Sequence, residues 1–181
     1  MCIMTLYFIT GNKNKLIEAQ HLIPSIKQLD IEVEEIQSND PQSIIKHKLE
    51  QACKHSQETF FVEDTSVYFP ALNMFPGPNI KWMVTDMGIE KIAELVHKYE
   101  DRTMIVKACI GLHVKGVLTF FEGTVTGTCV KPQGDGHGFT PMFQPEGHSI
   151  TFAQMTPDQK SQVSHRSLAV NQMKTFLQKQ E

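Results

Sequence analysis

The chain has 181 residues, of which 40% are hydrophobic and 20% are charged, and its formal net charge is −3. This length suits a single domain, 1–181, with a sizeable core, and the slightly acidic balance argues against a nucleic-acid-binding protein. No apolar run is long enough to span a bilayer, and no basic segment precedes the apolar start. We therefore expect a cytoplasmic protein without a membrane partner.

Four cysteines are spread along the chain at Cys2, Cys53, Cys109 and Cys129. They form no CxxC pair, so a zinc knuckle is not expected. Cys109 and Cys129 lie in apolar runs, and we expect buried free thiols in a reducing compartment.

The first half of the chain predicts alternating strands and helices. Segment 5–10 reads as a buried strand, and a helix is expected from Lys15 to Pro24. IEVEEI, 31–36, alternates apolar and acidic residues and predicts a half-solvated strand. A second helix is expected after Asp40, with one face formed by Ile44, Ile45, Lys48, Leu49 and Ala52. TFFVED, 59–64, predicts a short strand that ends in two carboxylates.

The second half begins with a turn-rich segment, 69–79, followed by a helical region over 81–99 with a break near Gly88. Segments 103–114 and 117–130 predict two long strands joined around Lys115-Gly116. A helix is expected to begin at Thr156-Pro157-Asp158, and a last helix runs through Leu168, Met173, Phe176 and Leu177. This order of elements predicts an α/β fold with a mixed sheet.

A first candidate for chemistry is FITGNKNK, where a strand leads through a glycine turn to the start of a helix. Helix N-termini attract anions, Thr10 and Asn12 can donate hydrogen bonds, and Lys13 and Lys15 add positive charge. The spacing is not that of a Walker loop. The two interpretations are a phosphate-binding loop and a plain strand–turn–helix with solvated lysines.

Carboxylates form the second candidate. Glu63-Asp64 follows an apolar strand, and ligands gather at the carboxyl ends of strands in α/β sheets. Adjacent carboxylates suit Mg²⁺, and one of them could orient or deprotonate a water molecule. Glu34-Glu35 offers further carboxylates. The alternatives are a solvated acidic turn for the first pair and an exposed strand edge for the second.

The third candidate is KSQVSHRS, in a break between two helices. Arg166 could recognise phosphate or carbonyl edges, and His165 could donate a proton or act as a general acid or base. The alternative is a solvated helix junction with Ser164 as its N-cap. A glycine-rich loop before it, GDGHGFTPMF, could supply a stacking wall for a base through His137 and Phe139.

Six segments together resemble the inosine triphosphate pyrophosphatases, also called the Ham1-like family. They read TGNKNK, VEDTSVYFPALNMFPGPNIKW, FFEGTVTG, GHGFTPMFQPEG, TFAQM and KSQVSHR, in that order over nearly the whole chain. The resemblance implies an elongated, twisted mixed sheet with two lobes flanking a central cleft. It also implies a homodimer that hydrolyses ITP, XTP and their deoxy forms to the monophosphate and pyrophosphate with Mg²⁺, or with Mn²⁺ in its place.

The resemblance also assigns roles to residues. Asp64 would help to hold the metal or activate the attacking water, and Lys15 and Lys48 would face the phosphates. The metal ligands would be Glu35, Glu63 and Asp64. The substrate contacts would be Thr10, Gly11, Asn12, Lys13, Thr65, His137, Phe139, Thr140, Lys160, Ser164, His165 and Arg166.

This chain departs from the family pattern in the glycine-rich loop. The family usually reads Gly-Phe-Gly-Tyr/Trp-Asp-Pro where this chain has GHGFTP, so Thr140 replaces an aspartate at the base pocket. Gln154 replaces a common glutamate, and variable spacing leaves Glu34 as an alternative to Glu35. Two alternatives stay open: the same reaction with altered or broadened base preference, and a nucleotide-binding protein with little catalysis.

Overall fold

A seven-stranded mixed sheet forms the centre of the computed structural model, which describes residues 5–179. Its strand order is β2-β1-β3-β5-β6-β7, with β4 paired to β3. β1 is parallel to β2 and β3, whereas β4 and β7 are antiparallel to β3 and β6. The strands are β1 (Tyr7–Phe8), β2 (Lys27–Gln28), β3 (Phe60–Phe69), β4 (Phe75–Gly77), β5 (Thr103–Val114), β6 (Val117–Cys129) and β7 (Phe143–Pro145). The predicted α/β class with a mixed sheet is confirmed.

Helices begin where the sequence supplies caps. Asn12 caps α1, Asp40 caps α2, and Thr156 forms a capping box with Gln159 at the start of α5. Gly88, at φ 80°, separates α3 from α4 at the predicted break. The helices are α1 (Lys13–Leu22), α2 (Pro41–Cys53), α3 (Ile80–Met87), α4 (Ile89–Val96), α5 (Pro157–Val163) and α6 (His165–Gln178), with short 3-10 helices η1 (Pro70–Leu72) and η2 (Thr140–Met142). No helix within residues 5–179 is long and apolar enough to cross a membrane.

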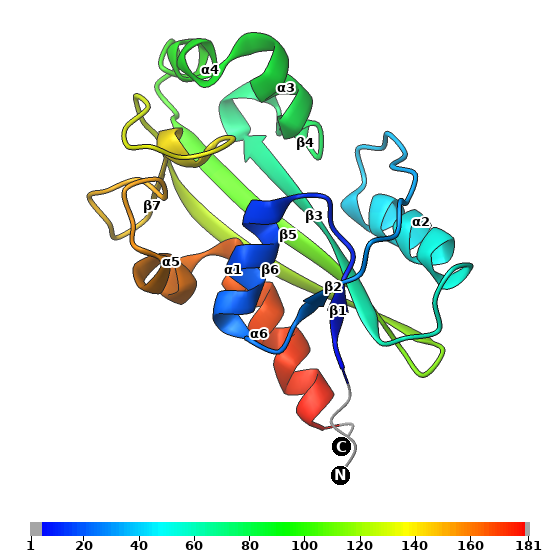
Figure 1. Ribbon diagram of the computed structural model, residues 1–181. Helices are drawn as coiled ribbons and strands as arrows, with labels where there is room; N and C mark the ends of the chain where they lie inside the picture. The colour runs from blue at the N-terminus through cyan, green and yellow to red at the C-terminus, as the bar shows by residue number, and fades with distance from the viewer. Residues whose placement is uncertain (1–4, 180–181) are drawn as a thin grey trace. The chain divides into compact units, whose positions relative to one another are not determined.

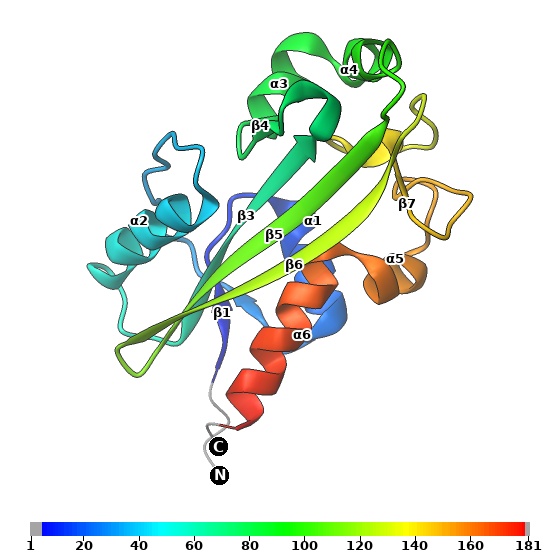
Figure 2. The ribbon, with the colours of Figure 1, turned by 180° about the vertical axis from the view of Figure 1, so that it is seen from behind.

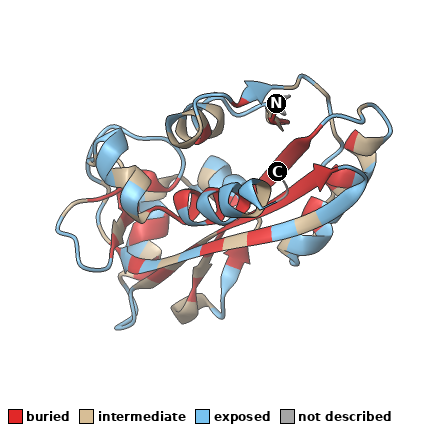
Figure 3. Ribbon diagram, turned by 90° about the horizontal axis from the view of Figure 1, so that it is seen from below, coloured by how far each residue is buried: buried red, intermediate tan, exposed pale blue. Residues whose placement is uncertain are grey.

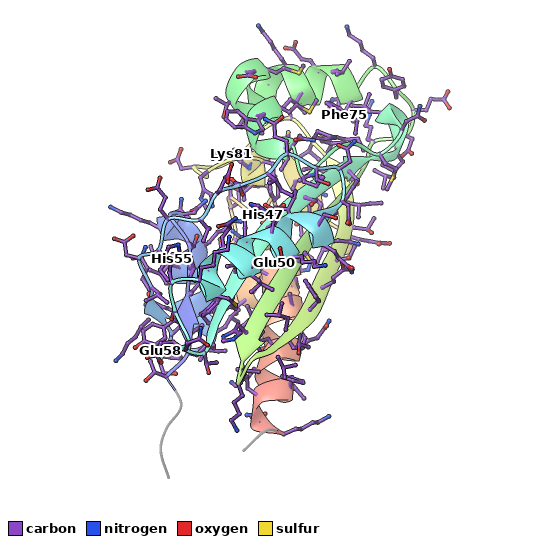
Figure 4. All side chains as sticks on the ribbon, turned by 90° about the vertical axis from the view of Figure 1, so that its right-hand side faces the viewer. His47, Glu50, His55, Glu58, Phe75 and Lys81 are labelled. Carbon is purple, nitrogen blue, oxygen red and sulfur yellow. The ribbon has the colours of Figure 1, made fainter. Side chains whose placement is uncertain are left out.

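The chain divides into two compact units, and β3, β5 and β6 contribute residues to both. Unit 1 comprises the described residues up to Asp64 together with 108–123 and 166–179. In this unit α1 and α6 pack on one face of the strands, and α2 packs on the opposite face (Figures 1 and 4). Figure 4 shows α2 with His47 and Glu50, followed by the connection with His55 and Glu58 that leads into β3.

Alternation along the strands of unit 1 sends neighbouring side chains to opposite faces. Phe61 packs in the core under α1 and α6, which we call the α1–α6 core. Phe60 and Val62 pack in the core under α2, which we call the α2 core. The predicted apolar face of α2 is confirmed, because its buried residues are Ile44, Ile45, Lys48, Leu49 and Ala52.

Unit 2 comprises residues 65–107 and 124–165 and has a core of its own. Helices α3 and α4 cover its strands on one side, and η2, β7 and Phe152 complete the core. Figure 2 shows the strands of this unit with α3 and α4 above them.

The predicted strand pair 103–114 and 117–130 is confirmed as β5 and β6, joined by Lys115 and Gly116 at φ 50° and 78°. Positive φ at both turn residues is typical of a tight hairpin. β5 is buried over most of its length, whereas β6 alternates between buried and exposed positions (Figure 3).

The prediction of a strand over 31–36 is wrong. This segment has no strand pairing, and the strand beside β1 is instead β2, earlier in the chain. Ile31 and Val33 are still half-buried against the α2 core. The alternating pattern therefore predicts which side chains face the core, but it does not predict whether the backbone pairs with another strand.

The predicted strand 59–64 is also too short, because β3 continues to Phe69. Glu63 and Asp64 consequently lie inside a strand. It is β1 that stops early, since its last residue, Phe8, pairs with Phe61. The two carboxylates of β3 thus lie just beyond the carboxyl end of the neighbouring strand, where the chain turns into α1.

The cysteines match the expectation of free thiols where they are described. Cys109 and Cys129 are buried, Cys53 is half-buried, and none of these three forms a disulfide. Burial raises the pKa of the Cys129 thiol to about 11, so it stays protonated at neutral pH. Cys2 lies outside the described residues.

Candidate functional site

The loop between β1 and α1 holds the first group of predicted residues. The Asn12 N–H donates to the Thr10 hydroxyl at 3.1 Å, and the Asn12 side-chain oxygen accepts from the N–H groups of Asn14 and Lys15 at 3.0 and 3.2 Å. Two backbone donors of the helix start are therefore satisfied by the cap. Gly11, Asn12 and Lys13 are exposed, so this loop presents polar groups to solvent.

Glu63 points to the face covered by α1 and α6, as Phe61 does two residues earlier. Arg166 of α6 donates to both of its oxygens, with Nε to Oε2 at 2.6 Å and Nη2 to Oε1 at 3.0 Å. Lys15 of α1 lies 3.4 Å from the same carboxylate, and Glu18 accepts a third hydrogen bond from Arg166. The Glu63 side chain is fully buried and is neutralised inside the fold.

Arg166 is equally buried, with 5% of its surface exposed. Burial alone would lower the pKa of its guanidinium, but the charges of Glu63 and Glu18 outweigh that effect and raise it. A permanent cation held by two carboxylates is a structural clamp. The structure thus gives Arg166, predicted to contact a base, two protein partners in unit 1.

Asp64 points to the opposite face, toward α2, because strand neighbours alternate. Lys48 Nζ lies 3.5 Å from Asp64 Oδ1 and also donates to Glu35. Burial raises the pKa of the Asp64 carboxyl, Lys15 and Lys48 lower it, and Glu35 and Glu63 raise it again, with a net increase. Asp64 is therefore a buried carboxyl whose ionisation is held back, and such groups gather at functional sites.

The donors around Asp64 fit a hard cation in part. Asp64 Oδ2 is buried and finds no hydrogen-bond partner in residues 5–179, and Glu35 lies across Lys48 from it. An unsatisfied buried carboxylate oxygen is the kind of ligand that Mg²⁺ takes, with water molecules completing its shell. In the described part of the chain, however, no three His, Cys, Asp or Glu residues cluster closely enough to form a closed metal site.

The two glutamates of the 31–36 segment are now distinguished. Glu35 accepts from Lys48, whereas no contact of Glu34 is found within residues 5–179, where its side chain is exposed. Glu35 is the better candidate beside Asp64. The metal-binding roles of Glu35, Glu63 and Asp64 stay predictions, and Arg166 competes for Glu63.

Unit 2 gathers most of the residues predicted to contact a base. The His165 ring stacks on Phe152 with a centroid distance of 6.0 Å and an interplanar angle of 20°, and it lies 6.0 Å from Phe139. Lys160 Nζ lies 5.6 Å from the centre of the Phe152 ring. Ser164, between α5 and α6, is buried. These side chains form an aromatic and cationic cluster.

The glycine-rich loop of unit 2 is held by its own polar groups. The Thr140 hydroxyl donates to the His137 carbonyl at 2.8 Å, and Thr140 is 5% exposed. Gln154 accepts from the Thr151 N–H at 2.9 Å. A Cβ at Gly136 would lie 2.5 Å from the Thr140 hydroxyl, so this glycine is required by close packing. Thr140 therefore uses its only side-chain donor inside the loop.

Sequence reasoning missed three residues of these clusters. Glu18 follows Lys15 by three positions, which places both on one face of α1 and could have indicated it. Phe152 precedes the polar junction in TFAQM. The Gln28 side-chain amide donates to the Thr10 carbonyl at 2.8 Å, and no local sequence pattern predicts that hydrogen bond. Thr65, the last predicted residue, is half-buried in β3 directly after Asp64.

The chain is similar in sequence and in structure to proteins of one family. A model of the Ham1 family matches residues 6–176. An inosine triphosphate pyrophosphatase of Ajellomyces capsulatus is 36% identical over 180 residues, covering 96% of each chain, and a dITP/XTP pyrophosphatase of Pyrobaculum aerophilum is 31% identical with the same coverage. The structure of the Staphylococcus aureus Ham1 protein superposes with a TM-score of 0.82 at 25% identity, covering 97% of this chain and 99% of that one.

Proposed function

Because the chain belongs to the Ham1 family, we propose that it hydrolyses non-canonical purine nucleoside triphosphates, such as ITP, dITP and XTP, to the monophosphate and pyrophosphate. The observation that carries this proposal is the arrangement of Lys15, Lys48 and Asp64 beside the loop that precedes α1. Two cations can bind the phosphates, and a carboxylate whose pKa is raised can accept a proton from the attacking water.

The two lysines supply positive charge where a triphosphate is most negative. Lys15 belongs to the start of α1, where the helix dipole adds to its attraction for phosphate. Lys48 is held by Glu35 and Asp64, so its ammonium is fixed in position before substrate arrives. Charge fixed in advance stabilises the leaving pyrophosphate without reorganisation.

Asp64 is the candidate for orienting and deprotonating the attacking water. A carboxylate with a raised pKa is a stronger base than an ordinary one. Glu63, bound to Arg166, cannot take this role without breaking two hydrogen bonds. The acidic pair is thereby divided between a base and a structural anchor.

Asp64 and Glu35 would hold a Mg²⁺ ion, with Mn²⁺ as an alternative, through their oxygens. When bound, such an ion would stabilise negative charge on the phosphates. Glu63 points to the opposite face of β3 and is bound to Arg166, so this arrangement does not place it beside that ion.

A broader base preference is a second candidate, and Thr140 favours it. Its hydroxyl donates to His137, which leaves lone pairs but no charge for a substrate. A carboxylate at this position would discriminate between base edges more strongly than a hydroxyl. We further propose a cytoplasmic homodimer without a nucleic-acid partner.

The test is pyrophosphate release from ITP, XTP, ATP and GTP, with and without Mg²⁺. We expect faster release from ITP and XTP than from ATP and GTP, and dependence on the ion. Asp64→Asn should lose most turnover yet bind nucleotide, whereas the control Asp86→Asn, at an exposed position of α3, should match the unaltered protein. Absence of pyrophosphate from every triphosphate, with binding retained, would favour a nucleotide-binding protein instead.

A further inference from the structure

The backbone of β1 directs its hydrogen bonds alternately to its two neighbours. The Tyr7 N–H donates to the carbonyl of Thr59, the residue before β3, and the N–H of Ile9, directly after β1, donates to the Phe61 carbonyl of β3, both at 3.0 Å. The carbonyls of Leu6 and Phe8 accept from N–H groups on the β2 side at 3.1 and 3.0 Å. The backbone N–H and C=O groups of odd-numbered residues thus point toward β3, and those of even-numbered residues point toward β2. A strand that is parallel to both of its neighbours has this pattern.

Gln28 extends this pattern beyond the end of the strand. Its side-chain amide donates to the Thr10 carbonyl at 2.8 Å and takes the place of the backbone donor that β2 no longer provides. The Thr10–Gly11 peptide is trans, so its carbonyl and its N–H point in opposite directions. Holding the Thr10 carbonyl toward β2 therefore aims the Gly11 N–H toward β3.

A continued ladder would offer the Gly11 N–H one acceptor on β3. That acceptor is the Glu63 carbonyl, two residues after Phe61, and the Lys15 ammonium donates to it at 3.5 Å. The Gly11 N–H itself makes no hydrogen bond within residues 5–179, to the Glu63 carbonyl or to any other acceptor. This donor points toward the strand that carries Asp64, on the side where Lys15 lies.

The space beside Gly11 is also open. A Cβ there would meet no atom within 4 Å, and the φ of this residue lies outside the left-handed region. Neither packing nor backbone conformation requires a glycine. An N–H that makes no hydrogen bond within residues 5–179, at an exposed glycine followed by Lys13 and Lys15, suits an anionic oxygen.

We propose that Gln28 is a positioning residue for the triphosphate: its amide fixes the Thr10–Gly11 peptide so that the Gly11 N–H donates to a phosphate oxygen. This inference rests on the proposed pyrophosphatase function and deepens it. Without Gln28, the peptide can rotate and the N–H no longer points at the site in every molecule. Affinity for the phosphates then falls, while the chemical step is unaffected.

The experiment replaces Gln28 by Met, which keeps the length of the side chain but removes the donor. We expect KM for ITP and the inhibition constant of inorganic tripolyphosphate to rise together by about 2- to 10-fold, the factor that corresponds to the net contribution of one hydrogen bond. The turnover number should stay within about twofold. Gln28→Leu serves in the same assays if the Met variant does not fold.

Gln57→Met is the matched control, because Gln57 is an exposed glutamine whose amide donates to the Cys53 carbonyl at 3.2 Å, away from the loop. If the Gln28 variants raise KM no more than this control, the inference is wrong. It is also wrong if turnover and melting temperature fall while tripolyphosphate inhibition is unchanged, since that marks a structural role. If the unaltered protein releases no pyrophosphate, the proposed function fails, and calorimetric binding of tripolyphosphate to the same variants still decides the role of Gln28.

Discussion

The clamp formed by Arg166 and Glu63 predicts a large loss of stability when it is opened. Replacing Arg166 by Met keeps much of the side-chain bulk but removes the guanidinium from the fully buried Glu63 carboxylate, while Lys15 stays 3.4 Å from it. Removing one partner of a buried ion pair costs about 3–5 kcal/mol, because the other charge stays buried without compensation. For a chain of this size, that loss lowers the melting temperature by about 6–20 °C.

A double-mutant cycle isolates the pair. Glu63→Gln in the Arg166→Met background removes the stranded charge, so the double variant should be more stable than the sum of the single losses by at least about 1.5 kcal/mol. The surface pair Lys46–Glu50 is the matched control, since its side chains are 66% and 54% exposed and their closest atoms lie 4.0 Å apart. Lys46→Met should cost no more than about 0.5 kcal/mol.

Urea denaturation followed by both tryptophan fluorescence and circular dichroism measures these differences and checks that the transitions coincide. Arg166→Met within about 1 kcal/mol of the unaltered protein, with only its base preference changed, would refute the clamp. That result would mean that Arg166 acts mainly on substrate and that Glu63 is stabilised by other groups.

The remaining predictions concern Asp64 and Thr140. We propose that hydrolysis uses the ionised Asp64, and burial raises the pKa of this carboxyl, so kcat/KM should fall on the acid side at a higher pH than an ordinary aspartate would give; a pH–rate profile measures this. The same raised pKa means that the folded protein binds more protons than the unfolded chain, so stability falls as pH rises from 3.8 through the raised value. Asp64→Asn should therefore melt at a higher temperature than the unaltered protein at neutral pH without divalent cations, and equal melting temperatures there would contradict the sign. Thr140→Val removes the hydroxyl donor to His137 but leaves the bond from the Thr140 N–H, so it should lower the free energy of unfolding by about 0.5–1.5 kcal/mol, the net contribution of one hydrogen bond. Thr140→Asp should sharpen the preference for ITP over ATP, and an unchanged triphosphate profile in that variant would show that position 140 does not select the base.

The local chemistry of the chain was sufficient to predict most helices and the long strands. Asn12, Asp40 and Thr156 cap helices through bonds to N–H groups only two or three residues away, so the signal lies within one turn. The buried face of α2 follows from its periodicity. These features depend on neighbours in the sequence, which is why a single sequence reveals them.

The failures concern partners distant in the sequence. The 31–36 segment has the alternation of a strand, but it can pair with β1 only if the edge of β1 is vacant. Lys27–Gln28 already pairs with that edge. The acidic pair looked like a strand end because apolar residues stop at Val62, whereas the backbone continues to pair through Phe69. Neither the pairing of β2 with β1 nor the continuation of β3 beyond Asp64 can be predicted from composition or periodicity.

The position of the acidic pair within a strand changes the chemistry that it can perform. Two adjacent carboxylates at the end of a strand could turn toward one ion, but inside β3 they must point to opposite faces. Glu63 then meets the buried arginine of α6, and Asp64 meets the lysine of α2. The strand thereby separates an anchor, whose charge is cancelled within the protein, from a carboxyl with one oxygen that has no partner within residues 5–179. Only the second can change its proton or its ligand without opening the ion pair with Arg166, which is why we propose Asp64, and not Glu63, as the carboxyl that acts in hydrolysis.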